Sequence, residues 1–393
     1  LYIERAEAIE GELNLPGVCQ GIQDLGERDT FPFEERSFFA AAVQALKHDR
    51  IDTLRGILGR RADSVWVGRG ENQAQWAVLQ AAIRLVEACE DGERQLPEHI
   101  RDQGTLIDYY LGSLREVDRL LREFEQVAGE YLDPSGLLIE VTTQARTVYR
   151  RLLGSMQGLF VKQLEKAGWP PPGRLANAEV FDRMVVPKLQ ESGHRVAVFL
   201  IDALRYELGV ELQKLLAEHI QVELQPAFAL LPSITVVGMA SLLPGAGQGL
   251  KLVRKDGQLV PMLHDQPLTT VVQRMDVLRK RYGQRFAETP LRPFAQNKVE
   301  VPEEVELLVL RSNEIDNDFE SNPEAAPGLI SRTFQQIRVA LHRLRGLGFQ
   351  DALIVTDHGF SLNTALGPGE VCLKPPGSWL NAHERLLLGD GAG

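Results

Sequence analysis

The residues best suited to chemistry stand in one short segment, Leu353-Ile-Val-Thr-Asp-His-Gly-Phe360. Its apolar run predicts a buried strand, and the glycine after Asp357 and His358 predicts a turn where that strand ends. In a parallel sheet, the carboxyl ends of the strands are the usual place for functional groups. Oxygen and imidazole ligands in succession suit zinc or manganese, although an Asp-His pair can also be a simple strand-end turn.

Two other apolar runs lead to carboxylates in the same way. The run 196–202 ends on Asp202, and the run 305–310 leads to Asp316, with Glu320 close behind as a possible co-ligand. Taken singly, Asp202 is more simply a helix N-cap, and the acidic residues near 316, which we expect to form a loop, could equally be solvated surface. Together with the Asp-His pair they converge on one sheet edge, which predicts a metal-assisted hydrolase.

Three further polar residues are candidates for the same site. Thr235 lies just inside the helix expected after Pro232, where a hydroxyl can bind a metal, lose its proton and attack phosphorus, while backbone N–H groups hold phosphoryl oxygens. Arg205 could bind a phosphoryl oxygen with two hydrogen bonds, or form a surface ion pair. His383 is the only late histidine and a candidate ligand. The plainer reading of Thr235 is a helix cap, and a lone histidine such as His383 is usually not a ligand.

Strand and helix patterns alternate from about residue 195. Strands are expected at 196–202, 305–310 and 351–356, and amphipathic helices at 205–219 and 327–344. Such alternation is typical of an α/β fold. Right-handed crossovers then predict a mostly parallel sheet with helices on both faces.

The N-terminal half has another pattern. Segments 37–46, 73–89, 104–127 and 137–159 carry apolar residues at spacings of three and four, as helices with one buried face do. No metal or nucleophile pattern occurs there. We therefore expect an all-helical region that serves as a scaffold or docking domain.

The segment Trp169-Pro-Pro-Pro-Gly173 breaks the helical pattern and predicts a connection. The expected organisation is a helical domain at 1–170, a linker and helix at 171–194, and a catalytic α/β domain at 195–393. The first residue is Leu rather than Met, so we also expect a fragment of a longer protein, truncated at its C-terminus.

Composition excludes several classes of protein. The 393 residues are 44% hydrophobic, with no apolar run of about 18 residues and no secretory signal pattern at the start. We therefore expect a cytoplasmic protein with no membrane partner. Three cysteines at wide spacing fit neither a disulfide framework nor a thiolate zinc site.

The formal net charge of −11 argues against a chain that coats nucleic acid over its whole surface. The charge is uneven, because residues 251–292 contain nine Lys or Arg against four Asp or Glu, whereas 300–324 is acidic. The acidic stretch suits cations, and the basic stretch could guide a phosphate substrate or be a solvated helix face.

The order of the candidate residues resembles the alkaline phosphatase superfamily, whose members hold two metals at the carboxyl edge of an α/β sheet around a Ser or Thr nucleophile. Four segments carry a closer resemblance, in this order: Ile201-Asp-Ala-Leu-Arg-Tyr-Glu207, Leu231-Pro-Ser-Ile-Thr-Val-Val-Gly-Met-Ala240, Ser312-Asn-Glu-Ile-Asp316 and Val355-Thr-Asp-His-Gly-Phe360. With these segments the chain resembles the PglZ family, and its helical half is similar to the region that precedes the catalytic domain in PglZ proteins of BREX phage-defence systems.

The resemblance implies two divalent ions, zinc or manganese, and a role for each candidate. The superfamily's Asp-x-x-x-His pattern for the second metal reads Asp316-Asn-Asp-Phe-Glu320 here, so either Glu320 supplies an oxygen ligand or the second site is weak or empty. The implied ligands of the first metal are Asp202, Thr235, Asp357 and His358, with Thr235 as nucleophile, and those of the second are Asp316 and His383.

The activity implied is hydrolysis of a phosphate ester through a covalent phosphothreonine. Because relatives in the family include phosphodiesterases and nuclease-like enzymes, and because 251–292 is basic, a diester or an oligonucleotide such as DNA is favoured as substrate over a small monoester. Two alternatives stay open. One is a non-catalytic assembly module that binds other proteins of a defence complex, and the other is a phosphomonoesterase or phosphotransferase of the same superfamily.

Overall fold

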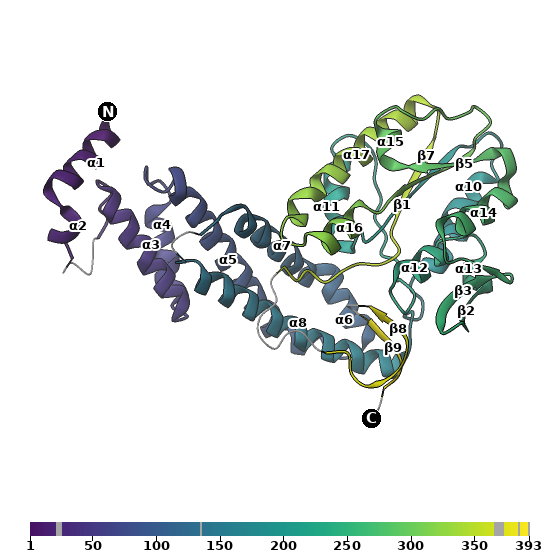
Figure 1. Ribbon diagram of the computed structural model, residues 1–393, viewed down its shortest axis with the longest axis horizontal. Coiled ribbons are helices and arrows are strands. Elements are labelled where there is room, and N and C mark those ends of the chain that lie inside the picture. The colour runs from purple at the N-terminus through teal and green to yellow at the C-terminus, as the bar shows by residue number, and fades with distance from the viewer. Residues whose placement is uncertain (21–25, 134–135, 365–372, 384–385, 392–393) are drawn as a thin grey trace. The chain divides into compact units, whose positions relative to one another are not determined.

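The computed structural model describes residues 1–20, 26–133, 136–364, 373–383 and 386–391 (Figure 1). Internal contacts divide the chain into two units, one formed by 1–101 with 112–160 and the other by 102–111 with 161–393. The expected linker at 171–194 thus groups with the second unit, while the domain limits themselves stay predictions. None of the helices in the described residues is both long and apolar enough to span a bilayer.

The first unit is helical, as expected. Its central helix α5 buries Trp76, Leu79, Ile83 and Val86, which recur at the spacing of one helix face. The helices of the N-terminal region are α1 (Tyr2–Leu13), α2 (Leu15–Val18), α3 (Pro32–Lys47), α4 (Ile51–Arg61), α5 (Gly70–Gln95), α6 (Gln103–Tyr109), α7 (Arg115–Glu130) and α8 (Ile139–Ala167), with a 3-10 turn at Leu96–His99 and a π-helical turn at Tyr110–Leu114.

The second unit is built on a four-stranded, fully parallel sheet in the order β5-β6-β1-β7. All six residues of β1 are buried, as in a strand covered on both faces. Strand β5, at one edge of this sheet, was not predicted from the sequence. The bounds are β1 (Val196–Ile201), β5 (Phe286–Pro290), β6 (Leu307–Ser312) and β7 (Asp351–Val355).

Side chains of β1 alternate between two apolar cores, with Phe199 on one face and Val198 on the other. This confirms the expected α/β sheet with helices on both faces. One face packs against α11 (Tyr206–Ala217), α15 (Leu291–Ala295), α16 (Glu314–Ser321) and α17 (Ala326–Gly346). The other packs against the π-helical turn Phe181–Val185, α10 (Val186–Leu189), α12 (Thr235–Ser241) and α14 (Val271–Tyr282). The short helix α9 (Asn177–Val180) leads into that π-helical turn.

Two small antiparallel sheets accompany the central one. The basic stretch 251–292 is not a single helix face, because it runs through a three-stranded sheet, then α14, β5 and α15. The acidic residues after β6 form helix α16 rather than the expected loop. The remaining elements are α13 (Ala246–Gly249), β2 (Leu250–Lys255), β3 (Gln258–Leu263), β4 (Gln266–Pro267), a 3-10 turn at Gly283–Arg285, β8 (Gly377–His383) and β9 (Leu386–Gly391).

Candidate metal centre

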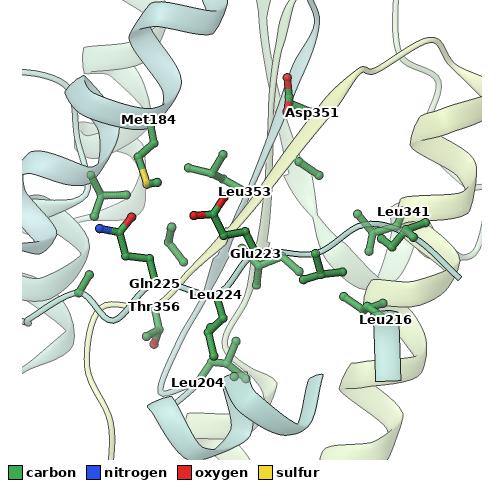
Figure 2. A pocket seen from close by; sticks show the side chains of 18 of the residues that line it. Met184, Leu204, Leu216, Glu223, Leu224, Gln225, Leu341, Asp351, Leu353 and Thr356 are labelled. Atoms are coloured by element: carbon green, nitrogen blue, oxygen red, sulfur yellow. The ribbon is translucent and has the colours of Figure 1, made fainter. Parts of the chain in front are cut away.

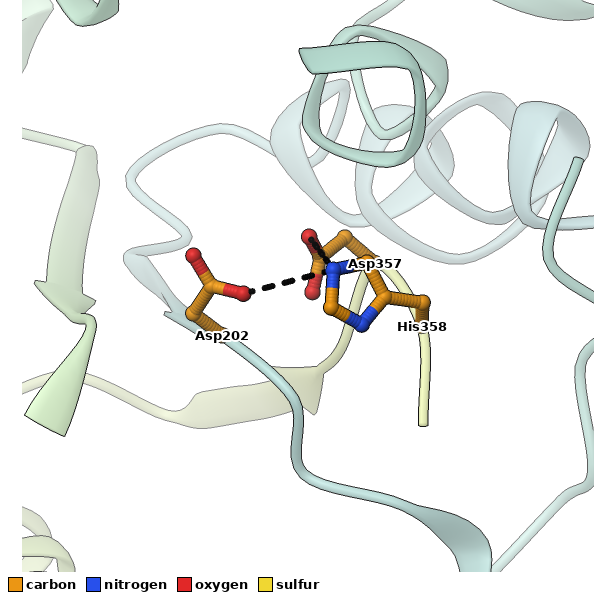
Figure 3. A group of neighbouring side chains, drawn as sticks. All are labelled: Asp202, Asp357 and His358. Atoms are coloured by element: carbon orange, nitrogen blue, oxygen red, sulfur yellow. Dashed lines mark ion pairs between the residues drawn. The ribbon is translucent and has the colours of Figure 1, made fainter. Parts of the chain in front are cut away.

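Asp202, Asp357 and His358 meet where two neighbouring strands end (Figure 3). Strands β1 and β7 run parallel with Leu200 opposite Val355, so the residues that follow them leave the sheet at the same edge. All three side chains are buried, and one ligand atom from each lies within 4.8 Å of the others. The structure therefore brings together the Asp-His pair and the separate carboxylate Asp202 that the sequence singled out.

The polar atoms of this cluster are incompletely satisfied by the protein. His358 Nε2 lies 3.3 Å from Asp357 Oδ2 and 3.7 Å from Asp202 Oδ1. The backbone N–H of Ala203 donates to Asp357 Oδ1 at 3.2 Å, but Asp357 Oδ2 is buried without a hydrogen bond. A buried carboxylate oxygen in this state is costly unless a cation accompanies it.

The imidazole of His358 is oriented for coordination. Its Nδ1 lies 3.0 Å from the carbonyl oxygen of Gly359. Because a carbonyl only accepts, Nδ1 carries the proton and donates, and Nε2 of the neutral ring turns its lone pair toward Asp202 and Asp357. A backbone carbonyl that fixes the histidine tautomer is a common feature around protein metal ligands.

The two carboxyl groups are costly to ionise without a cation. The pKa of Asp202 is raised to about 8. Burial is the largest cause, and the nearby charge of Asp357 is the second. Burial also raises the pKa of Asp357, to about 6, while hydrogen bonds from the backbone at Ala203, Asp357 and His358 lower it. Two carboxylates that resist ionisation together form a site that a divalent ion would neutralise.

Thr235 is the first residue of α12 and is half-buried beside the cluster. Its Oγ1 lies 3.1 Å from His358 Nε2 and 3.5 Å from Asp202 Oδ1. Gly238, one turn later, lets the helix come this close, because a Cβ there would lie 2.7 Å from both Cβ and the carbonyl oxygen of Asp357. The glycine thus sets the approach of the hydroxyl to the cluster.

Asn177 is a supporting residue that the sequence reading missed. Its buried Nδ2 donates to the carbonyl oxygens of Thr356 at 3.0 Å and Asp357 at 3.3 Å. These bonds fix the end of β7 where the ligands leave the sheet. Asn177 is the first residue of the short helix α9, a position that carries no sequence signal of this role, because its partners lie about 180 residues later.

Arg205 is close in sequence to Asp202, and its contacts face the loop that follows His358. Its Nε and Nη2 each lie 3.0 Å from Glu207 Oε2, and its guanidinium sits 4.6 Å from the centre of the Phe360 ring. Arg205 and Glu207 are both buried. These contacts stabilise the loop that follows His358.

The candidates for a second metal are arranged less closely. Asp316, in the first turn of α16, is buried, and its charge contributes to the raised pKa of Asp202. Glu320 lies four residues later on the same helix and is exposed. His383 ends strand β8, and its side chain lies outside what the structure describes. Within the described residues, only Asp202, Asp357 and His358 form a group able to hold a metal.

Arg274 is a second residue that sequence reasoning missed. It projects from α14 and is buried, and its Nη1 donates to the carbonyl oxygens of Leu268 at 3.2 Å and Thr269 at 3.4 Å. Burial lowers its pKa, while the nearby carboxylates of Asp357 and Asp202 act in the opposite direction. No carboxylate of the described residues forms an ion pair with it.

Residues 180–392 match the family model described as the BREX system PglZ alkaline phosphatase-like domain. Over 93% of its length the chain is 23% identical to the alkaline phosphatase-like protein BrxZ of Escherichia coli O9:H4 (strain HS). Over 92% it is 23% identical to the alkaline phosphatase-like protein PglZ of Bacillus cereus (strain H3081.97). The chain spans 44% and 43% of the length of these two relatives.

Proposed function

Because this chain belongs to the PglZ family, we propose that residues 195–393 form a metal-dependent phosphoesterase domain in which Thr235 is the nucleophile. The observation that carries the proposal is the 3.1 Å separation of Thr235 Oγ1 and His358 Nε2, beside two buried carboxylates. A structural metal site alone has no need of a hydroxyl at this position.

The residues present fit a divalent cation. Asp202 and Asp357 offer oxygen ligands, His358 offers nitrogen, and the buried Oδ2 of Asp357 lacks a hydrogen bond. This mixed donor set suits zinc or manganese. When bound, such an ion would lower the pKa of the Thr235 hydroxyl and offset charge on the phosphoryl group.

The protein's own residues position the reaction. Thr235 Oγ1 attacks phosphorus, so that a Thr–O–P bond forms while the bond to the leaving alcohol breaks. Water then cleaves the Thr–O–P bond, which restores the hydroxyl and releases a phosphate monoester from a diester substrate, or phosphate from a monoester. Asn177 and Gly238 hold the strand end and the helix in register, so that nucleophile and ligands keep a fixed geometry.

Arg274 is our candidate for the cation that binds the phosphoryl group, because its guanidinium is buried and, although burial lowers its pKa, the charges of Asp357 and Asp202 raise it. An arginine donates to phosphate oxygens in a fork that matches their geometry. We assign Arg274 this role in place of the one that the sequence suggested for Arg205, whose guanidinium is bonded to Glu207.

We favour a phosphodiester as the substrate, and an oligonucleotide as its class in the cell. The basic residues of β2, such as Lys251 and Lys255, are exposed and could attract a polyanion. We further propose that the domain acts within the defence complex of a BREX system, with a second metal held weakly or not at all, because Glu320 is exposed.

Hydrolysis of bis-p-nitrophenyl phosphate and p-nitrophenyl phosphate, with zinc or manganese added, tests this function. Thr235→Ala should lose at least ~10³-fold of the diester rate and keep its metal content, whereas Thr235→Ser should retain activity. Bound metal with no turnover of either ester would instead favour a non-catalytic assembly module. Faster turnover of the monoester would identify a phosphatase.

A further inference from the structure

Strand β7 has an open edge. It pairs with β1 on one side, and no other strand of the described residues pairs with it. Ala352 is exposed and Leu353, Ile354 and Val355 are only half-buried, although every residue of β1 is buried. An apolar strand of a parallel sheet is normally covered on all sides, and an open edge offers unpaired N–H and C=O groups to another strand.

A cavity of about 1720 Å³ runs along this edge (Figure 2). The whole of β7 lines one wall, and the extended segment 221–225 lines another. In that segment Val222 and Leu224 are half-buried while their neighbours are exposed, which is the period-two alternation of a strand. No backbone hydrogen bond joins residues 221–225 to any part of the chain that the structure describes.

Helices from both faces of the sheet border the cavity. Leu216 of α11 and Leu341 of α17 border it on one side, and Met184 of the π-helical turn borders it on another (Figure 2). A strand of five or six residues is about 17–20 Å long, which matches the five residues of β7. The alternate side chains of such a strand would meet apolar residues on both faces.

The lining also indicates the charge of the occupant. Helix α17 contributes Arg338, His342 and Arg345 to the cavity. The carboxylate of Asp351 at the start of β7 is engaged by Lys188 at 2.8 Å and His194 at 2.6 Å. An occupant with acidic residues on the side of α17 would therefore be complementary to this wall.

We propose that the cavity receives one extended β-strand, apolar at alternate positions and acidic toward α17, that belongs to the same polypeptide in PglZ proteins of full length. Both relatives match more than nine-tenths of this chain, yet the chain spans less than half of each of them. A segment of these relatives outside the matched region could therefore supply a strand beside β7. The inference rests on the open edge and stands independently of the proposed hydrolysis.

The added strand would lie beside the metal centre, because Thr356 and His358 also line the cavity. It would complete the hydrogen bonding of β7 just before its ligand residues. Strand addition of this kind obtains its affinity from main-chain hydrogen bonds and its specificity from alternate side-chain pockets.

A photo-crosslinking residue at Glu223 tests the proposal in the full-length natural protein. Glu223 is exposed on the cavity wall, so the replacement removes no buried contact. Mass spectrometry should find the crosslink on a segment of the same polypeptide outside residues 1–393. A crosslink only to another protein, or none, would overturn the proposal. The matched control is Val272 on α14, which is 67% exposed and does not line the cavity, and it should not reach that segment.

Hydrogen exchange on the unmodified full-length protein gives a second test that needs no variant. The amides of β7 that point away from β1 should exchange at least ~10²-fold more slowly than the same sequence in an unstructured peptide. Exchange of these amides at the rate of an exposed edge would contradict the proposal, whatever the crosslinking result.

Discussion

Asp357 Oδ2 lies 3.3 Å from His358 Nε2, and it is buried without a hydrogen bond. When the ring is neutral, the histidine turns an unprotonated nitrogen toward this oxygen, because Nδ1 then donates to the carbonyl oxygen of Gly359. Two acceptors that face each other in a buried site repel, and a cation between them would remove the repulsion. This pair is the strongest single indication of a metal centre in the chain.

The first prediction concerns pH. Without metal, the pKa of Asp202 is about 8 and that of Asp357 about 6 in the folded protein, both above the usual value of 3.8. Between about pH 4 and pH 8 the folded state thus holds protons that the unfolded state releases, so stability falls as pH rises. The slope should not exceed about 1.4 kcal/mol per pH unit for each group.

Thermal unfolding of chelator-treated protein at pH 5, 6, 7 and 8 measures this slope. Asp202→Asn should flatten it, and zinc should raise the melting temperature most at pH 8. A melting temperature that does not change with pH in the metal-free wild type would contradict the predicted ionisation.

The second prediction concerns Gly238. A Cβ at this position would press on the backbone of Asp357 at 2.7 Å, so Gly238→Ala should push α12 away and weaken both metal affinity and turnover. We expect a loss of stability of about 1–3 kcal/mol, as in other overpacked cores. Gly328→Ala on α17 is the matched control, because nothing lies within 4 Å of its Cβ. Equal behaviour of the two variants would show that the close approach has no role.

The third prediction separates Arg274 from an ordinary surface arginine. Arg274→Met should lower kcat/KM for phosphate esters by about 10²-fold with unchanged metal content, because a donor to the phosphoryl oxygens is lost. Arg274→Lys should recover part of the rate. The control, Arg279→Met, lies on the same helix and is 53% exposed in an ion pair with Asp276. If both methionine variants keep wild-type kinetics, Arg274 does not bind the substrate.

The fourth prediction concerns Arg205. Arg205→Met leaves the carboxylate of Glu207 buried without its ion pair and should cost about 3–5 kcal/mol of stability. Combining it with Glu207→Leu should restore most of that loss and leave turnover close to wild type. Denaturant unfolding and ester hydrolysis measure the two effects. If Arg205→Met alone is stable but inactive, Arg205 acts in catalysis and not only in stability.

Much of the site follows from sequence because the ends of parallel strands meet at one edge. Asp202 and Asp357 each follow an apolar run, and this local pattern was enough to place them together once the sheet was expected to be parallel. Thr235 at a helix start was predicted in the same way, from the proline and serine that precede it.

The rest depends on packing between distant segments. Asn177 and Arg274 lie in none of the four segments that the sequence singled out. Gly238 lies in segment 231–240, but nothing local shows its role. Each of the three acts on residues about 70 to 180 positions away. Helix α16 was expected as a loop because its acidic residues resemble surface, although one of its faces buries Asp316. The open edge of β7 could not be foreseen, since periodicity does not reveal strand order.

The central claim is that Asp202, Asp357 and His358 hold a divalent ion beside Thr235. An anomalous difference map from crystals grown with zinc tests it most directly. We predict a peak about 2.0–2.2 Å from His358 Nε2 and from one carboxylate oxygen of each aspartate. A fully occupied zinc elsewhere in the protein, with no peak among these three side chains, would contradict the account.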